Sequence, residues 1–263
     1  MLVEQVTQSV SSMVGEFILQ ASRDATTDFP ITQPQFDWMS EDMLKYTRIM
    51  LLSFLTSFGG YSLAKWGVPG FPWFISDWGV FTAIGTEFLL TYAHFRDFDV
   101  YYDNLVKAIY EMVFPLQAFC TSLYWGVYYT PGTWDPSNWD TYVYPIFMHI
   151  VPLLTFTVES VFNSIVFDIQ KGAWRSLWLI LAYLPLSYFA KDIVGYLPYP
   201  TIVDWASWKS NGWVAAVIAL NQAFFYGIAY LNNYLKTGSG VSPKHFFKYH
   251  VDSFKDLTKL AKF

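Results

Sequence analysis

One serine and one histidine are the pair of residues in this sequence that could do chemistry together. Ser76 lies near the start of one long apolar stretch, and His149 lies inside another. A serine hydroxyl is a weak nucleophile until a base takes its proton, and histidine is the usual base. The pair predicts nucleophilic catalysis if the fold brings the two residues together, whereas hydrogen bonding between helices is the alternative role for His149.

Acidic residues inside the apolar stretches are the next candidates, because a charge in hydrocarbon is costly and is retained mainly for function. Glu159 follows His149 by ten residues, which is ~15 Å along a helix and too far to orient the imidazole. Asp77, beside Ser76, is the better orienting residue. Glu87 sits deep, where it either pairs with a neighbouring helix or faces a cavity as a protonated acid. Asp77, Glu87 and Glu159 are therefore possible supporting residues of the site.

The sequence favours neither a metal ion nor a cofactor. Its four histidines, His94, His149, His245 and His250, share no ligand spacing. Its single cysteine, Cys120, lies in an apolar run, where it can form neither an internal disulfide nor a multi-cysteine metal site. We therefore expect no cofactor, no metal ion and a packing role for Cys120.

The elements that must position these residues are predicted to be membrane-spanning helices. The chain is 54% hydrophobic and only 14% charged, whereas a soluble domain carries about 25% charged residues. A helix needs about 20 mostly apolar residues to cross a bilayer core of about 30 Å. Six windows meet this requirement: 46–66, 72–95, 106–129, 142–167, 174–191 and 212–235. The predicted fold is an all-α polytopic membrane helix bundle with about six transmembrane helices.

The distribution of basic residues predicts the orientation of this bundle. With six spans, 13 of the 16 Lys and Arg residues fall on the side that holds both termini, and three fall on the other side. The positive-inside rule then places both termini in the cytosol or the mitochondrial matrix. Ser76 and His149 lie ~6 Å and ~10 Å below the outer boundary at 1.5 Å per residue. This similar depth favours their pairing.

The chain divides into three predicted parts. Residues 1–44 form a polar N-terminal segment, in which 2–22 carry an amphipathic helical stripe. Residues 45–236 form the six-helix transmembrane domain. Residues 237–263 form a basic amphipathic tail that starts a helix at Ser242-Pro243. Such terminal helices suit an anionic membrane surface, and a partner-binding or solvated helix is the equally weighted alternative.

Five short motifs occur in a recognisable order between about residue 45 and residue 236. They are Phe74-Ile75-Ser76-Asp77-Trp78-Gly79, Phe114-Pro115 with an aromatic run to Trp125, His149 through Pro152 to Glu159, Tyr199-Pro200 with Asp204-Trp205, and Leu231-Asn232-Asn233-Tyr234. In this order and spacing the chain resembles the androgen-induced protein family of six-span enzymes and the related rolling stone proteins. No single motif is specific, and the resemblance lies in their order.

The resemblance implies an intramembrane hydrolase of fatty acid esters of hydroxy fatty acids. In that family a threonine is the nucleophile and a histidine its base, so Ser76 takes the nucleophile position and His149 the base position. Serine in place of threonine keeps the hydroxyl but departs from the family pattern. The alternative hypothesis is a non-catalytic accessory subunit that keeps the fold inside a larger membrane complex.

Location and partners follow from the same features. Residues 1–24 show no cleavable secretory or transit signal, which favours the endomembrane system, with the mitochondrial inner membrane as the alternative. Membrane lipids are the expected partners, together with other complex subunits if the chain is an accessory subunit. The net charge of -5 argues against nucleic acid as a partner.

The six-span topology predicts that tags at the two ends of the chain share one side of the membrane. The physical reason is that an even number of crossings returns the chain to the side on which it began. Protease protection of N-terminal and C-terminal tags in sealed vesicles measures this. Tags found on opposite sides would contradict the even number of spans.

Overall fold

The structure, a computed structural model, describes residues 30–66, 73–129, 135, 137–195, 199, 205 and 208–237. This part of the chain is all-α, as predicted, and its only extended pairing is an isolated bridge between Pro34 and Asn163. The helices are α2 (Glu41–Trp66), α3 (Ile75–Tyr92), η1 (Ala93–Phe95), α4 (Val100–Leu123), the π-helical η2 (Tyr124–Tyr128), α5 (Trp139–His149), α6 (Val151–Phe162), α7 (Ile169–Val194) and α8 (Lys209–Thr237).

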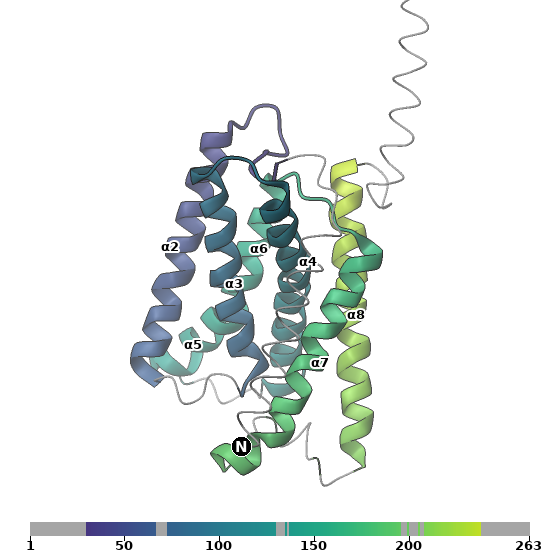
Figure 1. The fold of residues 1–263 in the computed structure, drawn as a ribbon. Helices are drawn as coiled ribbons and strands as arrows, with labels where there is room; N and C mark the ends of the chain where they lie inside the picture. Colours follow the sequence, from purple (N-terminus) through teal and green to yellow (C-terminus); the bar gives the residue numbers. More distant parts are fainter. Residues whose placement is uncertain are drawn as a thin grey trace, which may run out of the picture.

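The helices lie side by side as a bundle, with α5 and α6 forming one broken rod (Figure 1). We call the end where α2, α4 and α7 begin the near end, and the end where α3 and α8 begin the far end. Helix α4 is central, because it packs against α3, α6, α7 and α8. Each of the six predicted windows is occupied by a long helix or, in the fourth window, by the α5–α6 pair.

Helix α4 begins at Val100 because Asp99 caps it. The Asp99 carboxylate accepts the backbone N–H of Tyr101 at 2.9 Å and that of Tyr102 at 3.4 Å. These bonds satisfy donors that have no partner inside the helix. The bond from Tyr101 is the largest cause that lowers the pKa of Asp99 below its ordinary value, and Arg96 adds to the effect. The cap is therefore ionised at neutral pH.

The fourth rod is broken at Ile150. Pro152 has no N–H, and its ring would clash with the carbonyl four residues earlier in a continuous helix. The N–H of Ile150 donates to the carbonyl of Ile146 at 2.8 Å, and the N–H of Leu154 donates to that of Ile150 at 2.9 Å, so helix resumes on both sides. The predicted window 142–167 thus contains two helices, and its last residues are not helical.

The non-helical segment 163–168 receives its backbone partners from α8. Asn233 accepts the N–H of Phe167 at 2.8 Å and donates to its carbonyl at 3.0 Å. Asn232 donates to the carbonyl of Ile165 at 3.0 Å. Because buried backbone groups need partners, these two amides allow an extended segment to lie inside the bundle.

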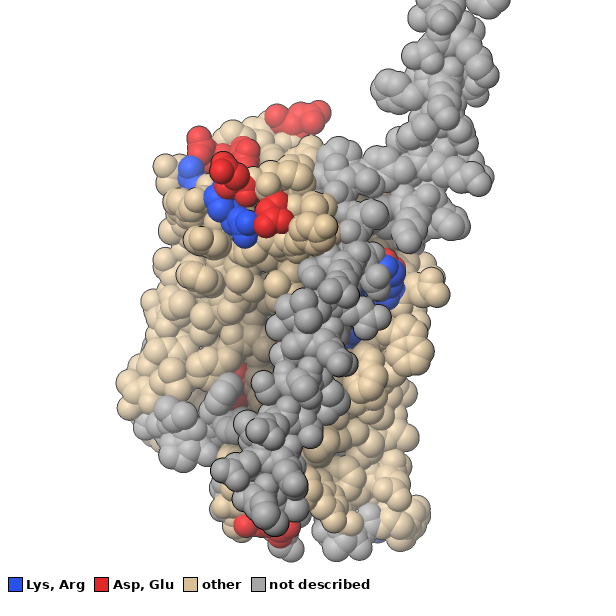
Figure 2. All heavy atoms as spheres, viewed as in Figure 1, with Lys and Arg blue, Asp and Glu red and all other residues tan. Residues whose placement is uncertain are grey.

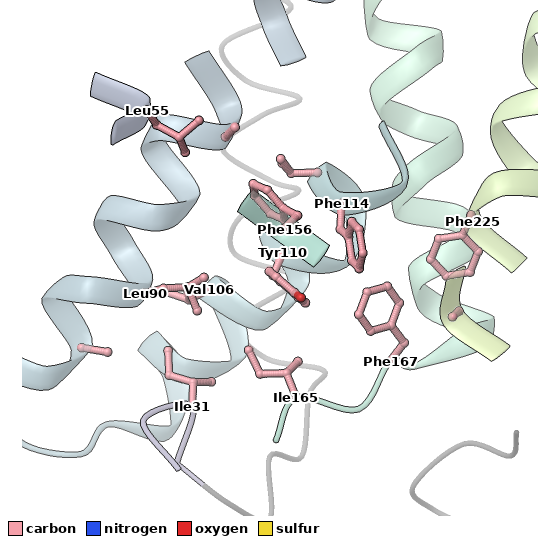
Figure 3. Close-up of a cluster of buried hydrophobic side chains, with 14 of the residues drawn as sticks. Ile31, Leu55, Leu90, Val106, Tyr110, Phe114, Phe156, Ile165, Phe167 and Phe225 are labelled. Atoms are coloured by element: carbon pink, nitrogen blue, oxygen red, sulfur yellow. The ribbon is translucent and has the colours of Figure 1, made fainter. Parts of the chain in front are cut away.

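An aromatic cluster fills the centre of the bundle (Figure 3). Tyr110 of α4 stacks on Phe156 of α6, with ring centroids 5.5 Å apart. Phe167 approaches Tyr110 edge-on at 5.7 Å, and Phe225 of α8 packs beside Phe167 at 6.3 Å. Aromatic pairs of this kind add ~0.5–1.5 kcal/mol beyond the area that they bury. The cluster joins α4, α6 and α8 into one core.

A buried ion pair joins the elements of the near end. Arg48 and Glu159 are both fully buried, and the Arg48 guanidinium donates to one Glu159 oxygen at 2.6 Å and 3.0 Å. The same guanidinium donates to the carbonyls of Ile31 at 3.0 Å and Leu90 at 3.2 Å. A further bond at 3.0 Å reaches the ring of His94. One side chain therefore connects α2, α3, η1, α6 and the segment that precedes α2.

The bundle buries polar side chains beside its apolar core and exposes large apolar side chains on its surface. Charged and amide side chains are buried, among them Arg48, Glu87, Glu111, Glu159, Asn221, Asn232 and Asn233. Large apolar side chains are exposed on every outer helix, among them Met50, Phe54, Phe88, Leu154, Trp174, Trp178, Leu220, Tyr230 and Leu235. On the face drawn in Figure 2, charged side chains gather mainly at the near end and leave the flank of α2 uncharged.

Two stretches of the described residues are long and apolar enough to cross a membrane, Val143–Phe162 and Lys209–Thr237. A buried core helix of a soluble protein can meet the same test. Here, however, only 33% and 17% of the most apolar stretches are buried. These helices give weak support for a membrane location, and the count of six spans stays a prediction.

The ends of the chain lie outside the described residues, including the stripe at 2–22 and the tail after Thr237. Residues 30–40, which the sequence assigned to the N-terminal segment, pack on the bundle instead. Ile31 is buried in the aromatic core, and its N–H donates to Asp103 at 3.0 Å. Helix α2 begins at Glu41, slightly before the domain boundary predicted at residue 44.

Replacing Arg48 with methionine should destabilise the protein by ~3–5 kcal/mol, because it leaves the Glu159 carboxylate buried without its cation. Adding Glu159→Gln to Arg48→Met should recover part of this loss, since the double variant buries no unpaired charge. Denaturant or thermal unfolding of purified protein in detergent measures both. The control is Lys45→Met, which removes an exposed ion pair with Asp42 and should change little. Equal effects of Arg48→Met and Lys45→Met would contradict the structural role of Arg48.

Candidate functional site

A partly open cavity of about 210 Å³ lies at the far end of the bundle. We call it the far-end cavity. Its wall consists of Phe74, Ile75, Ser76, Cys120, Leu123, Tyr124, Tyr128, His149 and Tyr199. These residues come from the start of α3, the end of α4 with η2, the end of α5 and the chain before α8. The structure thus places Ser76 and His149 on the wall of the same cavity.

The start of α3 positions Ser76. Phe74 is the N-cap, and its carbonyl accepts the N–H groups of Asp77 at 3.1 Å and Trp78 at 3.3 Å. The N–H of Ser76 has no acceptor within the helix, as is general for the first turn. The Ser76 side chain and backbone both hydrogen-bond with Tyr199. The positive end of the helix dipole at this position favours a negatively charged oxygen.

The break between α5 and α6 positions His149. His149 is the last residue of α5, and the break caused by Pro152 follows it directly. Its ring stacks on Tyr124 with centroids 3.9 Å apart and planes 11° apart. The Thr121 hydroxyl donates to its backbone carbonyl, which ties the end of α5 to α4. The ring nitrogen Nδ1 is buried and has no hydrogen-bond partner.

Ser76 and His149 share a cavity but are not directly bonded. Among the described residues, no hydrogen bond joins the Ser76 hydroxyl to the His149 ring, and no carboxylate contacts that ring. Asp77 interacts electrostatically with Cys120 and Tyr144 instead. The arrangement therefore offers a serine and a histidine without an orienting acid. A substrate or a water molecule in the cavity would have to complete the contact.

Glu87 and Glu159 lie away from this cavity. Both belong to the near end, where Glu159 pairs with Arg48 and Glu87 interacts electrostatically with both. They therefore cannot support the imidazole of His149. Within the described residues, moreover, His, Cys, Asp and Glu side chains form no group that could hold a metal ion.

The structure adds two residues whose importance the sequence reading missed. Tyr199 was noted only as part of a motif, and its contact with Ser76 depends on the fold of a distant segment. Arg48 is one of the 13 basic residues that the sequence places on the inner side, and nothing in that count distinguishes it. Its position inside the first apolar window is a usable signal, because a buried base in an apolar stretch is as costly as a buried acid.

A smaller, mostly apolar cavity of about 30 Å³ adjoins the far-end cavity. Ile75, Leu123 and Tyr199 line both, and the smaller one continues along α7 and α8 past Leu184 and Val217. The far-end cavity is smaller than the ~300–1,000 Å³ of a typical ligand pocket. It therefore suits the reacting group of a substrate and a few methylene groups rather than a whole lipid.

His149→Phe should leave the stability within ~1 kcal/mol of the natural protein, because phenylalanine keeps the stacking on Tyr124 and removes an unpaired buried nitrogen. His149→Ala, the size control, should cost ~2–5 kcal/mol because it leaves a void. Thermal unfolding in detergent compares the three proteins. A loss from His149→Phe as large as that from His149→Ala would show that the ring nitrogens have a structural partner.

Comparisons with known proteins identify no relative of this chain. No family model, no curated protein and no solved structure matches it. The likeness of its motifs to the androgen-induced proteins therefore stays a prediction, and the function is argued from the geometry of the site.

Proposed function

We propose that the protein is a multi-pass membrane protein whose far-end cavity is the active site of a serine-type lipid-ester hydrolase. The observation that carries the proposal is that Ser76 and His149, which lie on different helices, line one cavity. The resemblance to the androgen-induced proteins puts a nucleophile and a base at the same two positions.

The membrane part of the proposal rests on the distribution of side chains. Apolar side chains on the outside and buried ion pairs on the inside are what a bilayer requires, because unpaired charges cannot face hydrocarbon. Helices occupy all six windows predicted to span the bilayer. A six-span bundle with both termini on one side is the arrangement that fits these features.

The proposed reaction begins when the Ser76 hydroxyl oxygen attacks the ester carbonyl carbon. A ring nitrogen of His149 accepts the hydroxyl proton and returns it to the departing alcohol, which leaves an acyl-serine. Water, deprotonated by the same ring, then releases the fatty acid and restores both residues. No carboxylate contacts the ring, so the imidazolium is less stabilised than in a Ser-His-Asp triad. Turnover should therefore be slower than in an enzyme with a complete triad, by up to ~10⁴-fold.

The start of α3 supplies groups that suit the charge formed in this reaction. A carbonyl attacked by Ser76 acquires a negative oxygen close to the positive end of the α3 dipole. The hydroxyl of Tyr199, which hydrogen-bonds with Ser76, is a donor at this position. A donor to such an oxygen typically contributes ~10²–10³ in kcat.

The apolar surroundings favour an ester of a lipid over a polar ester. The cavity wall combines Ser76 and His149 with Ile75, Leu123 and aromatic rings, and the adjoining apolar cavity extends it. A substrate would enter from the bilayer with its ester in the far-end cavity and part of an acyl chain in the smaller one.

Ser76→Ala should abolish labelling by a fluorophosphonate probe and lower the hydrolysis of nitrophenyl esters by ~10³-fold or more, since it removes the nucleophile. Purified protein in detergent or lipid nanodiscs provides the measurement. The matched control is Ser57→Ala, which removes an exposed hydroxyl bonded to the Ser53 carbonyl at 2.7 Å and should react like the natural protein.

Folded natural protein that neither labels nor turns over esters would refute the hydrolase. The alternative, a non-catalytic subunit of a membrane complex, would then be the better reading. Labelling that survives in Ser76→Ala would show that a different residue is the nucleophile.

A further inference from the structure

We infer that Glu87 is a proton-binding site, a carboxyl group that keeps its proton at neutral pH in the interior of the bundle. The inference concerns the near end and uses no residue of the far-end cavity. It is therefore independent of the proposed hydrolase.

Glu87 is fully buried on α3, and neither of its side-chain oxygens has a hydrogen-bond partner. The charged or titratable groups around it come from three other helices, namely Arg48 of α2, Tyr110 of α4 and Glu159 of α6. Two further groups interact with these neighbours of Glu87. His94 of η1 and Lys236 of α8 each interact electrostatically with Arg48 and Glu159. Among the described residues, Arg48 is the cation that interacts electrostatically with Glu87.

Arg48 has no donor left for Glu87. A guanidinium carries five N–H groups. Two of them bond to Glu159, and three bond to Ile31, Leu90 and His94. An ionised Glu87 would therefore have to break an existing bond of Arg48 to obtain a donor.

Lys236 is also committed to other acceptors. Its ammonium donates to Asn163 at 2.6 Å and to the carbonyl of Ile165 at 2.8 Å. Asn163 in turn donates to Glu159 at 3.0 Å, so the bonds of Lys236 lead to the existing ion pair and not to Glu87. Neither Arg48 nor Lys236 is therefore bonded to Glu87.

A carboxylate without donors is strongly disfavoured in a protein interior, and its neighbour Glu159 adds repulsion. Protonation removes both penalties. It also creates one O–H donor, and the second oxygen of Glu159 is a buried acceptor without a partner. The proton on Glu87 thus fits the unsatisfied groups around it, whereas a second negative charge does not.

The test is infrared spectroscopy of the full chain in lipid nanodiscs at neutral pH, in the region where protonated carboxyl groups absorb. The natural protein should show a protonated-carboxyl band that is absent in Glu87→Gln and retained in Glu41→Gln. Glu41 is the matched control, since it is an exposed glutamate at the same end of the bundle. Glu87→Leu is the second variant, because a side chain without partners can be replaced by an apolar one of similar size.

Either of two results would overturn the inference. One is the absence of a protonated-carboxyl band in the natural protein at neutral pH. The other is a band that stays at full strength in both Glu87→Gln and Glu87→Leu, which would assign the proton to another residue.

The pH dependence of unfolding gives an independent readout. An unfolded glutamate loses its proton near pH 4.3, so above about this pH the folded protein binds one proton more than the unfolded protein. Raising the pH should then favour unfolding through Glu87 by up to tenfold per pH unit in the equilibrium constant. Glu87→Gln should lack this component from about pH 5 upwards, whereas parallel profiles of the two proteins would contradict the inference.

Discussion

The near end of the bundle depends on Arg48, because every N–H group of its guanidinium donates to a buried acceptor. Its bonds reach Glu159 on α6, Leu90 on α3, His94 on η1 and Ile31 before α2. A buried ion pair is weak evidence for stability by itself, because desolvation offsets much of its attraction. Here the same group also pairs backbone carbonyls, so its loss would leave several buried acceptors without donors. Together with the packing of α2, this side chain fixes the register of α2 against α3 and α6.

Side chains inside and outside the bundle follow one rule, that polar groups lie where other polar groups can pair with them. Glu111 shows this on α4, where it accepts from Arg175 at 2.8 Å and from the N–H of Asp168 at 2.7 Å. Gly172 lies so close to Glu111 and Phe225 that a methyl group there would meet the phenylalanine ring at 2.6 Å. Close approach of α7 to α4 and α8 thus depends on a small residue, as is common where helices pack without a hydrophobic driving force.

The sequence predicts the helices better than it predicts their partners. Apolar windows locate every long helix of the described residues, since a continuous apolar stretch can be recognised without knowledge of its neighbours. The sequence does not predict the break before Pro152, because the mean hydropathy of a window does not detect one missing N–H. It does not predict the extended segment after Phe162 either, because the amides that pair this segment lie on a distant helix. Depth along the helices brought Ser76 and His149 to one end, but the contact of Tyr199 with Ser76 depends on a loop whose path no periodicity specifies.

Helix α3 and the broken rod of α5 and α6 each carry residues of the far-end cavity and of the polar cluster around Arg48. Helix α3 holds Ser76 near its start and Glu87 eleven residues later, ~16 Å along the axis. The broken rod holds His149 before its break and Glu159 ten residues later. Effects of substitutions at sites separated by more than ~7–10 Å without shared partners usually add. The far-end cavity and the near-end cluster therefore share a scaffold but not a network, and a change confined to one region can be interpreted without the other.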